Sequence, residues 1–187
     1  MNEPFFSVVM PTFNRFNKIS QTIESVLNQT FKNYEFIIVD DGSTDQTEEV
    51  INRYRPKDPR IKYIKTKNWG GPARPRNIGI EASKGSYISF LDDDDIWYPN
   101  KLERIVESHK SGKIVQHLLA VNEKKTYRRV RTDVDWSNVL VNFGYMYQHS
   151  PTSGLSFARE VLDPFFPLVD VEEMRGYSDG CILMLAM

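Results

Sequence analysis

Two runs of carboxylates are the residues in this sequence whose types and spacing could do chemistry. Asp40 and Asp41 begin the segment Asp-Asp-Gly-Ser, and Asp92–Asp95 form an uninterrupted row of four. Two carboxylates about 4 Å apart repel by roughly 4 kcal/mol at an effective dielectric constant near 20, so such a row must splay into solvent or meet a cation. Oxygen ligands of this kind suit Mg²⁺ or Mn²⁺, which can bridge a carboxylate to a phosphate. The acidic runs therefore indicate a metal-assisted site for a phosphate-bearing ligand.

A segment rich in glycine and arginine lies between the two acidic runs and supplies cations. Residues 68–77 read Asn-Trp-Gly-Gly-Pro-Ala-Arg-Pro-Arg-Asn. The glycines allow a ligand to approach the backbone closely, and Arg74 and Arg76 offer forked donors that suit a diphosphate. The segment is not a P-loop, because no Gly-Lys-Ser/Thr follows it, and the sequence contains no G-x-G-x-x-G motif.

Each acidic run directly follows a short apolar segment that is typical of a buried strand. The predicted strands are Phe6–Met10, which Pro11 should end, Phe36–Val39, Ile61–Ile64 and Tyr87–Leu91. The predicted helices are Lys18–Asn28, a helix from a Ser43–Gln46 capping box through Tyr54, Asn77–Ser83, and a helix after Pro99. This alternation predicts an α/β fold, a doubly wound and mostly parallel sheet with helices on both faces. Because ligands bind at the carboxyl ends of such strands, the acidic runs are better interpreted as a binding site than as solvated turns.

The pattern is looser beyond Gly112. Ile114–Val121 and Tyr127–Val130 are predicted to form an antiparallel pair. The final residues, Ile182–Met187, form an apolar run without a capping signal. We therefore expect a helix there that the sequence does not complete.

The composition excludes several classes of protein. The chain has 187 residues, with 24 Lys+Arg against 25 Asp+Glu and a formal charge of −1, so nucleic-acid binding is not expected. Cys181 is the single cysteine, which excludes an internal disulfide framework and fits a reducing compartment. No apolar run approaches the ~20 residues of a membrane span, and the N-terminus lacks a secretory signal. We expect a cytoplasmic protein, with peripheral contact with the inner face of the membrane left open.

Five segments, in this order, resemble the family 2 glycosyltransferases of the GT-A fold. They are Val8–Arg15, Ser25–Thr30, Ile38–Asp45, Arg76–Gly79 and Phe90–Trp97. The resemblance is close from about Phe6 to Leu102 and loose over the remainder. It implies a GT-A-type sheet with a small antiparallel addition on the acceptor side. It also implies a nucleotide-sugar-binding half, residues 1–112, and an acceptor-side half, residues 113–187.

The resemblance implies a nucleotide site for a donor that is expected to be UDP-linked. In that family the loop after the first strand cradles the nucleotide, which places Pro11, Thr12 and Phe13 beside the base and ribose. Asp40 takes the role of the acid that contacts uracil, since a carboxylate can accept the imide N–H of that base. Asp41 is expected either to order the turn or to contact the nucleotide directly.

The resemblance also implies a diphosphate and metal site. Arg76 matches the family's basic residue near the diphosphate. The D-x-D signature falls on Asp92, Asp93 and Asp94. Asp94 is expected to bind Mn²⁺ or Mg²⁺, and Asp93 to reach the ribose or the surroundings of the metal. Asp95 is expected to lie farther from the metal or to cap a helix.

Members of this family invert the anomeric centre in a single displacement, in which one general base activates an acceptor hydroxyl. That base is an Asp in a short acidic motif opening a late helix, and the segment Gly176–Gly180 resembles the motif. Asp179 is therefore the candidate base; in the alternative interpretation it only caps the helix. The reserve candidates are Asp170, Glu172 and Glu173.

The function implied is transfer of a sugar from a UDP-sugar to a hydroxyl of a glycan or a lipid-linked glycan. One alternative is a module that binds nucleotide-sugars without catalysis. A second is a metal-dependent phosphatase of the haloacid dehalogenase type, because Asp92-x-Asp94 resembles its nucleophile motif. That motif normally follows the first strand of its fold, whereas here it follows the fourth predicted strand, which favours the glycosyltransferase.

Overall fold

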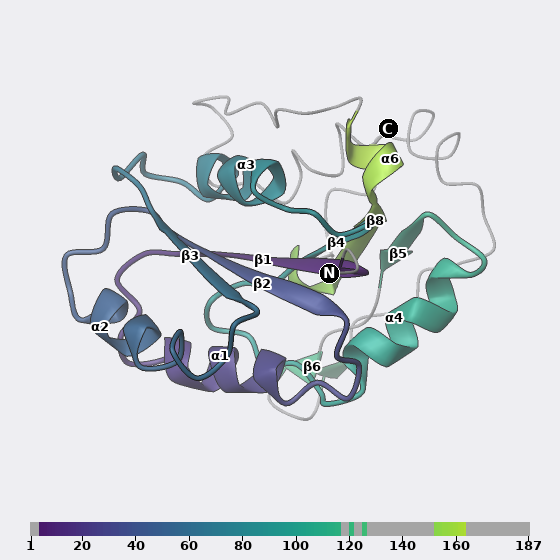
Figure 1. The fold of residues 1–187 in the computed structure, drawn as a ribbon, viewed down its shortest axis with the longest axis horizontal. Coiled ribbons are helices and arrows are strands. Elements are labelled where there is room, and N and C mark those ends of the chain that lie inside the picture. Colours follow the sequence, from purple (N-terminus) through teal and green to yellow (C-terminus); the bar gives the residue numbers. More distant parts are fainter. Residues whose placement is uncertain (1–3, 117–119, 122–124, 127–151, 164–187) are drawn as a thin grey trace.

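A computed structural model of the chain describes residues 4–116, 120–121, 125–126 and 152–163. At its centre is a six-stranded sheet with helices on both faces (Figure 1). In order across the sheet, the strands are β3 (Ile61–Lys65), β2 (Tyr34–Asp40), β1 (Phe6–Thr12), β4 (Tyr87–Phe90), β8 (Leu155–Ala158) and β5 (Ile114–Gln116). The first four run parallel, whereas β8 is antiparallel to both of its neighbours. The predicted doubly wound, mostly parallel sheet with an antiparallel addition is therefore confirmed.

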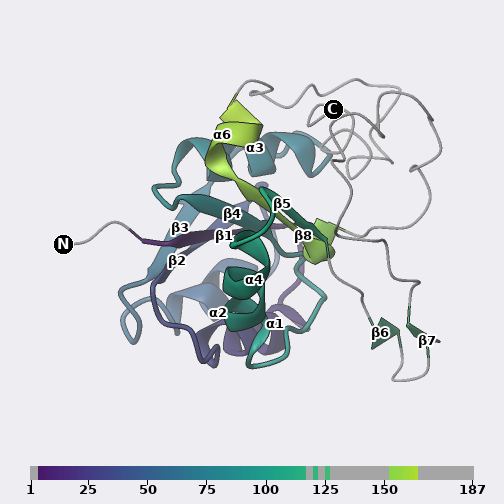
Figure 2. The same cartoon turned by 90° about the vertical axis from the view of Figure 1, so that its right-hand side faces the viewer.

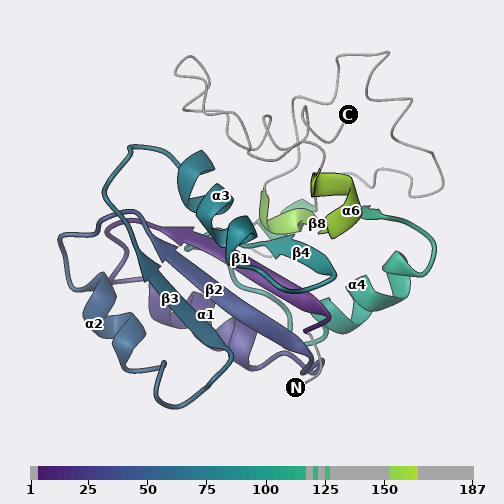
Figure 3. The same ribbon diagram turned by 45° about the horizontal axis from the view of Figure 1, so that its top comes forward.

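The helices are divided between the two faces of the sheet (Figures 1 and 3). One face carries α1 (Ile19–Leu27), α2 (Thr47–Asn52) and α4 (Lys101–His109); the other carries α3 (Ala73–Glu81) and α6 (Arg159–Leu162). A short 3₁₀ helix, η2 (Thr152–Gly154), leads into β8. The strands β6 (Ala120–Val121) and β7 (Lys125–Thr126) pair antiparallel as a separate small sheet (Figure 2).

Two apolar layers sandwich the sheet, because successive side chains of a strand point to opposite faces. In β1, Val8 and Met10 belong to the larger core cluster, which also contains Ile23 of α1. Val9, between them, belongs to the second cluster together with Ile80 of α3. All of these side chains are buried, and each stabilises the fold by about 1.5–3 kcal/mol.

Strand β1 continues past Pro11, so the prediction that this proline ends the strand is wrong. Pro11 pairs in register with Val39 of β2. The pairing of β1 with β4 extends only to Val9 opposite Phe90, so Pro11 has a strand neighbour on one side alone. Proline is tolerated where a strand has such an edge. The extension carries β1 to Thr12, at the edge of the sheet where the acidic runs begin.

Helix α3 begins four residues before its predicted start at Asn77. The carbonyl of Pro72 accepts a hydrogen bond from the Arg76 N–H at 3.1 Å, and Pro75 falls in the first turn, where proline is tolerated. A Cβ on Gly79 would lie well inside van der Waals contact with Val9, so α3 lies directly on β1. This close approach fixes where the first turn of α3 meets the carboxyl ends of the strands.

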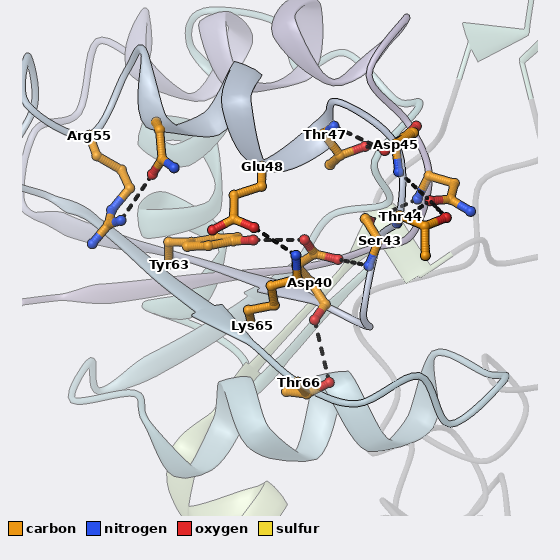
Figure 4. Close-up of polar contacts among 12 residues, drawn as sticks. Asp40, Ser43, Thr44, Asp45, Thr47, Glu48, Arg55, Tyr63, Lys65 and Thr66 are labelled. Atoms are coloured by element: carbon orange, nitrogen blue, oxygen red, sulfur yellow. Dashed lines mark hydrogen bonds and ion pairs between the residues drawn. The ribbon is translucent and has the colours of Figure 1, made fainter.

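The capping box predicted at Ser43 and Gln46 is wrong. The Ser43 hydroxyl accepts a hydrogen bond from the backbone N–H of Asn14 at 2.9 Å, and Gln46 makes no capping hydrogen bond. Asp45 Oδ1 instead accepts the N–H of Thr47 at 2.9 Å, and α2 begins at Thr47 (Figure 4). The Ser43 side chain thus ties together the loops that follow β1 and β2.

The segment Ile114–Val121, predicted to form one strand of an antiparallel pair with Tyr127–Val130, contains two separate short strands, β5 and β6, in the described residues. β5 covers only Ile114–Gln116 and pairs with β8, whose strand was not predicted. β6 pairs with β7, and residues 127–130 lie outside the described part of the chain. None of the helices in the described ranges has both the length and the apolar character that crossing a bilayer requires.

Candidate functional site

A cleft of about 540 Å³ opens at the carboxyl ends of the parallel strands, where the loops after β1, β2, β3 and β4 meet. This volume is in the range of small-molecule sites, and the location is where open α/β sheets bind ligands. Eight of the residues predicted to contact the donor or the metal line it: Pro11, Thr12, Phe13, Asp41, Arg76, Asp92, Asp93 and Asp94. Asp40 does not line the cleft.

The Asp41 side chain forms one wall of the cleft. It is 5% exposed and accepts hydrogen bonds from the backbone N–H groups of Trp69 at 3.2 Å and of Gly70 at 3.3 Å. Burial raises the pKa of this carboxyl above its ordinary value, although the two N–H groups oppose the shift. The turn that follows needs a glycine, because Gly42 has a φ of +78° and a Cβ there would lie 2.7 Å from the backbone nitrogen of Asn68.

Asp40 is fully buried behind the cleft wall. Its two carboxylate oxygens accept hydrogen bonds from the Ser43 N–H and the Tyr63 hydroxyl, both at 2.7 Å (Figure 4). Its carbonyl accepts the Thr66 N–H at 2.8 Å. Burial and the hydrogen bond to Asp40 raise the pKa of Tyr63. The structure therefore places Asp40 where it orders the turn and Asp41 where it can meet a ligand, the reverse of the preferred expectation for this pair.

The acidic row after β4 faces the cleft with its first three carboxylates. Asp92 Oδ1 lies 2.9 Å from a guanidinium nitrogen of Arg76, which is itself 2% exposed in the first turn of α3. Asp93 is mostly buried. Burial raises the pKa of its carboxyl above the ordinary value, although the charge of Arg15 opposes this shift. The side chain of Asp94 is 41% exposed and thus accessible to a ligand.

A buried lysine is connected to the acidic row through Ser153. Lys101 of α4 donates a hydrogen bond to the carbonyl of Ser153 at 2.7 Å, and its Nζ lies 3.3 Å from the centroid of the Trp97 ring. The Ser153 hydroxyl accepts the N–H of Asp92 at 2.7 Å. Burial lowers the pKa of Lys101 well below its ordinary value, while the charges of Asp95 and Asp92 oppose that shift. Asp95, expected to lie farther from the metal or to cap a helix, thus acts on Lys101 through its charge.

Arg15 also lines the cleft, although no role was predicted for it from the sequence. Its Nε lies 3.0 Å from Asp93 Oδ1, and a second guanidinium nitrogen lies 3.7 Å from Asp94 Oδ2. The sequence signal that could have found it is a basic residue three positions after the end of a strand, in the first segment of the family resemblance. Lys101 carries no comparable signal, because it resembles an ordinary exposed helix residue.

The donor set of the cleft suits a hard divalent cation. Asp93 and Asp94 bring carboxylate oxygens to the same wall, with the Arg76 guanidinium lining the cleft as well. Mg²⁺ typically binds one or two carboxylates together with the phosphates of a substrate. Within the described residues, no group of three His, Cys, Asp or Glu side chains converges to hold a metal. The predicted base, Asp179, and the reserves Asp170, Glu172 and Glu173 lie outside the described residues.

Comparison with known proteins bears on this cleft. A family model described as glycosyl transferase family 2 matches residues 7–160. An uncharacterized glycosyltransferase of Nostoc sp., alr2836, is 37% identical over 95% of this chain and 58% of its own length. The Escherichia coli protein WfaP is described as UDP-Glc:alpha-D-GlcNAc-diphosphoundecaprenol beta-1,3-glucosyltransferase. It is 34% identical over 89% of this chain and 66% of its own length.

A solved structure has a similar fold. The crystal structure of residues 1–349 of S. aureus TarS in complex with UDP matches with a TM-score of 0.80 and 26% identity. The match covers 97% of this chain and 54% of that chain. This chain therefore spans little more than half the length of the proteins that it matches first.

Proposed function

The chain belongs to glycosyl transferase family 2 and has its GT-A fold, and from that premise we propose that the cleft binds a nucleotide-diphosphate sugar. The chain transfers the sugar to a hydroxyl acceptor. The observation that carries the proposal is the set of carboxylates in one cleft. Asp41 can accept a hydrogen bond from a nucleobase, and Asp93 and Asp94 can bind a metal. Arg76 adds a cation for the diphosphate.

In this proposal the donor is a UDP-sugar, and Asp41 takes the role expected of Asp40. The Asp41 carboxylate lines the cleft, where it can accept the imide N–H of uracil, whereas Asp40 is fully buried behind the cleft wall. Phe13, which is 41% exposed in the lining of the cleft, offers an aromatic face to the base or ribose, beside Pro11 and Thr12. The complex of S. aureus TarS with UDP supports the choice of uridine.

Asp94, assisted by Asp93, would hold Mg²⁺ or Mn²⁺ against the diphosphate. When bound, the cation supplies neutralisation of the charge that grows on the departing diphosphate. Arg76 stabilises the same charge from the first turn of α3, where its guanidinium is held in place by Asp92. Asp92 thus positions Arg76 rather than contacting the donor.

The transfer proceeds with inversion, because one general base activates the acceptor hydroxyl for attack opposite the nucleotide. We propose Asp179 as that base. The acceptor is a glycan or a lipid-linked glycan, and the description of WfaP, which names a diphosphoundecaprenol-linked acceptor, supports the lipid-linked class. An acceptor of this type would bring a cytoplasmic enzyme into peripheral contact with the inner face of the membrane.

Release of UDP from a panel of UDP-sugars, measured with Mn²⁺ and with EDTA, tests the proposed function. We expect slow, Mn²⁺-dependent hydrolysis of one donor, which a suitable acceptor accelerates and which Asp94→Asn abolishes. Hydrolysis of a generic phosphomonoester would instead identify the phosphatase alternative. Metal-dependent binding of UDP-sugar without any turnover, even with acceptors present, would identify a binding module.

A further inference from the structure

Arg15 pairs with the two carboxylates that are assigned above to the metal and its surroundings. Its Nε lies 3.0 Å from Asp93 Oδ1 and another guanidinium nitrogen lies 3.7 Å from Asp94 Oδ2. A guanidinium keeps its charge at every pH at which the protein is folded. A permanent cation therefore lies directly beside the place where a divalent cation would bind.

The loop that carries Arg15 is held in place by the loop after β2. The Arg15 N–H donates to the Thr47 hydroxyl at 2.8 Å, and the N–H of Asn14 donates to the Ser43 hydroxyl at 2.9 Å. Asn14 adopts the left-handed backbone conformation, with φ of 51°, and its side-chain oxygen accepts the N–H of Thr44 at 2.9 Å. These contacts fix the backbone at Arg15, so its long side chain remains over Asp93 and Asp94.

Two cations at the same pair of carboxylates repel each other, and charge counting shows when both can be accommodated. Asp93 and Asp94 together carry two negative charges, and Arg15 offsets one of them. A divalent cation added to this group brings the local sum of charges to one positive. A diphosphate adds two or more negative charges, and its oxygens suit both a hard cation and a forked guanidinium. The nucleotide would therefore relieve the repulsion.

We propose that Arg15 makes binding of the divalent cation depend on the diphosphate of the donor. Without nucleotide, the guanidinium competes with the cation for Asp93 and Asp94. With nucleotide, the guanidinium and the cation share the diphosphate. This inference rests on the proposed function, and it adds a residue that selects the metal–nucleotide pair over the metal alone.

The test is Mn²⁺ affinity, measured by calorimetry with and without saturating UDP, in the wild type and in Arg15→Gln, Arg15→Lys and Arg104→Gln. Arg104 is an exposed residue of α4, so its variant controls for loss of one positive charge. We expect Arg15→Gln to bind Mn²⁺ about tenfold more tightly without UDP, a change of about 1.4 kcal/mol. With UDP, the Mn²⁺ affinity of Arg15→Gln should differ from that of the wild type by less than about threefold. The ratio of the Mn²⁺ affinity with UDP to that without UDP should therefore be smaller in Arg15→Gln than in the wild type. Arg15→Lys and Arg104→Gln should keep the wild-type ratio.

The same measurement separates failure of this inference from failure of the proposed function. Arg15→Gln with the wild-type Mn²⁺ affinity in the absence of UDP would overturn the inference while leaving the metal site intact. Equal loss of the ratio in Arg15→Lys would also overturn it, because the charge would then not be the cause. A wild type that binds no Mn²⁺ even with UDP would contradict the metal-assisted function, and the inference with it. Uridine, which lacks the diphosphate, should leave the Mn²⁺ affinity of the wild type unchanged, and an effect equal to that of UDP would count against Arg15.

Discussion

The carboxylates of Asp40 and Asp41, adjacent in sequence at the end of β2, face different surroundings. Asp41 borders the cleft and accepts the N–H groups of Trp69 and Gly70, whereas Asp40 is buried between Ser43 and Tyr63. Successive side chains of a strand alternate in direction, in keeping with the different surroundings of Asp40, the last residue of β2, and Asp41, the residue after it. The pair therefore divides into a ligand-facing acid and an acid that orders the turn.

Replacing Asp41 with Asn should remove the preference for uridine nucleotides. The Asn side chain keeps one oxygen for the Trp69 N–H but presents a weaker acceptor, or an amide donor, to the imide N–H of uracil. We expect UDP to bind roughly 10–100-fold more weakly, as for loss of a charge-assisted hydrogen bond. Calorimetry with UDP and ADP checks this. A variant that still prefers UDP as strongly as the wild type would remove Asp41 from base recognition.

The Asp41→Asn protein should also be more stable than the wild type at neutral pH in the absence of nucleotide. Burial raises the folded-state pKa of Asp41 above its unfolded value. The contribution of Asp41 to stability is therefore present below the unfolded pKa and is lost as the pH rises through the folded pKa. Melting curves should show the advantage of the variant at pH 7 and its disappearance near pH 3. A variant that melts lower at pH 7 would contradict the direction of the shift.

Replacing Asp40 with Ala should destabilise the fold rather than act directly on the ligand. The variant leaves the Ser43 N–H and the Tyr63 hydroxyl without their acceptor, at a cost of about 1–3 kcal/mol in the free energy of unfolding. Tyr63→Phe is the matched control, because it removes one of these hydrogen bonds and should cost about 0.5–1.5 kcal/mol. Urea denaturation measures both. Wild-type stability in Asp40→Ala would show that this network does not hold the turn.

The packing of α3 on β1 should not tolerate a methyl group at Gly79. A Cβ there would lie well inside van der Waals contact with Val9, so we expect Gly79→Ala to cost about 1–3 kcal/mol of stability. Gly71→Ala is the control, because a Cβ at Gly71 meets nothing within 4 Å. Urea denaturation of both variants measures the difference. Equal stability of the two would mean that α3 can shift away from β1, and with it the position of Arg76.

Glu35 should make stability fall in acid. It is 5% exposed and accepts hydrogen bonds from Lys62, from the Ser7 hydroxyl at 2.6 Å and from the Lys84 N–H. Burial opposes its ionisation, but these hydrogen bonds outweigh burial and lower its pKa below the ordinary value of 4.5. A lowered folded pKa contributes stability that is present above the unfolded pKa and lost as the pH falls through the folded pKa.

Glu35→Gln should therefore lower the free energy of unfolding at pH 7 by about 1.5–3 kcal/mol, the range for hydrogen bonds to a charged group. The difference from the wild type should narrow steadily as the pH falls below 4.5. Denaturation curves at a series of pH values check this. A difference that stays constant from pH 7 to pH 3 would show that ionised Glu35 is not the source of the stability.

The parallel strands and the loops of the cleft could be predicted because they depend on local patterns. An apolar run such as Phe36–Val39 followed directly by acids indicates both a buried strand and the end at which a ligand binds. The starts of α2 and α3 were harder, because capping depends on contacts from elsewhere. The Ser43 hydroxyl accepts the N–H of Asn14 and does not cap α2. The hydrogen bond from the Arg76 N–H to the Pro72 carbonyl adds a turn at the start of α3.

What the sequence could not determine depends on contacts between distant residues. β8 lies antiparallel beside β4, although more than 60 residues separate their sequences, and no local signal sets that partner. Which of Asp40 and Asp41 faces the cleft depends on the pairing of β2 and on the Tyr63 hydroxyl of β3. The pairing of Arg15 with the acids after β4 is set by the loop after β2.

Thermal stabilisation by nucleotides is the measurement that tests the central claim most directly. The wild type and Asp94→Ala are each melted with UDP, GDP and ADP, in Mn²⁺ and in EDTA. UDP with Mn²⁺ should stabilise the wild type by about 2.7 kcal/mol at 100 times its dissociation constant, while GDP and ADP stabilise it less. EDTA or Asp94→Ala should remove most of this effect without lowering the melting temperature of the free protein. Equal stabilisation of the wild type and Asp94→Ala by UDP, with or without EDTA, would contradict a metal-assisted UDP-sugar site in the cleft.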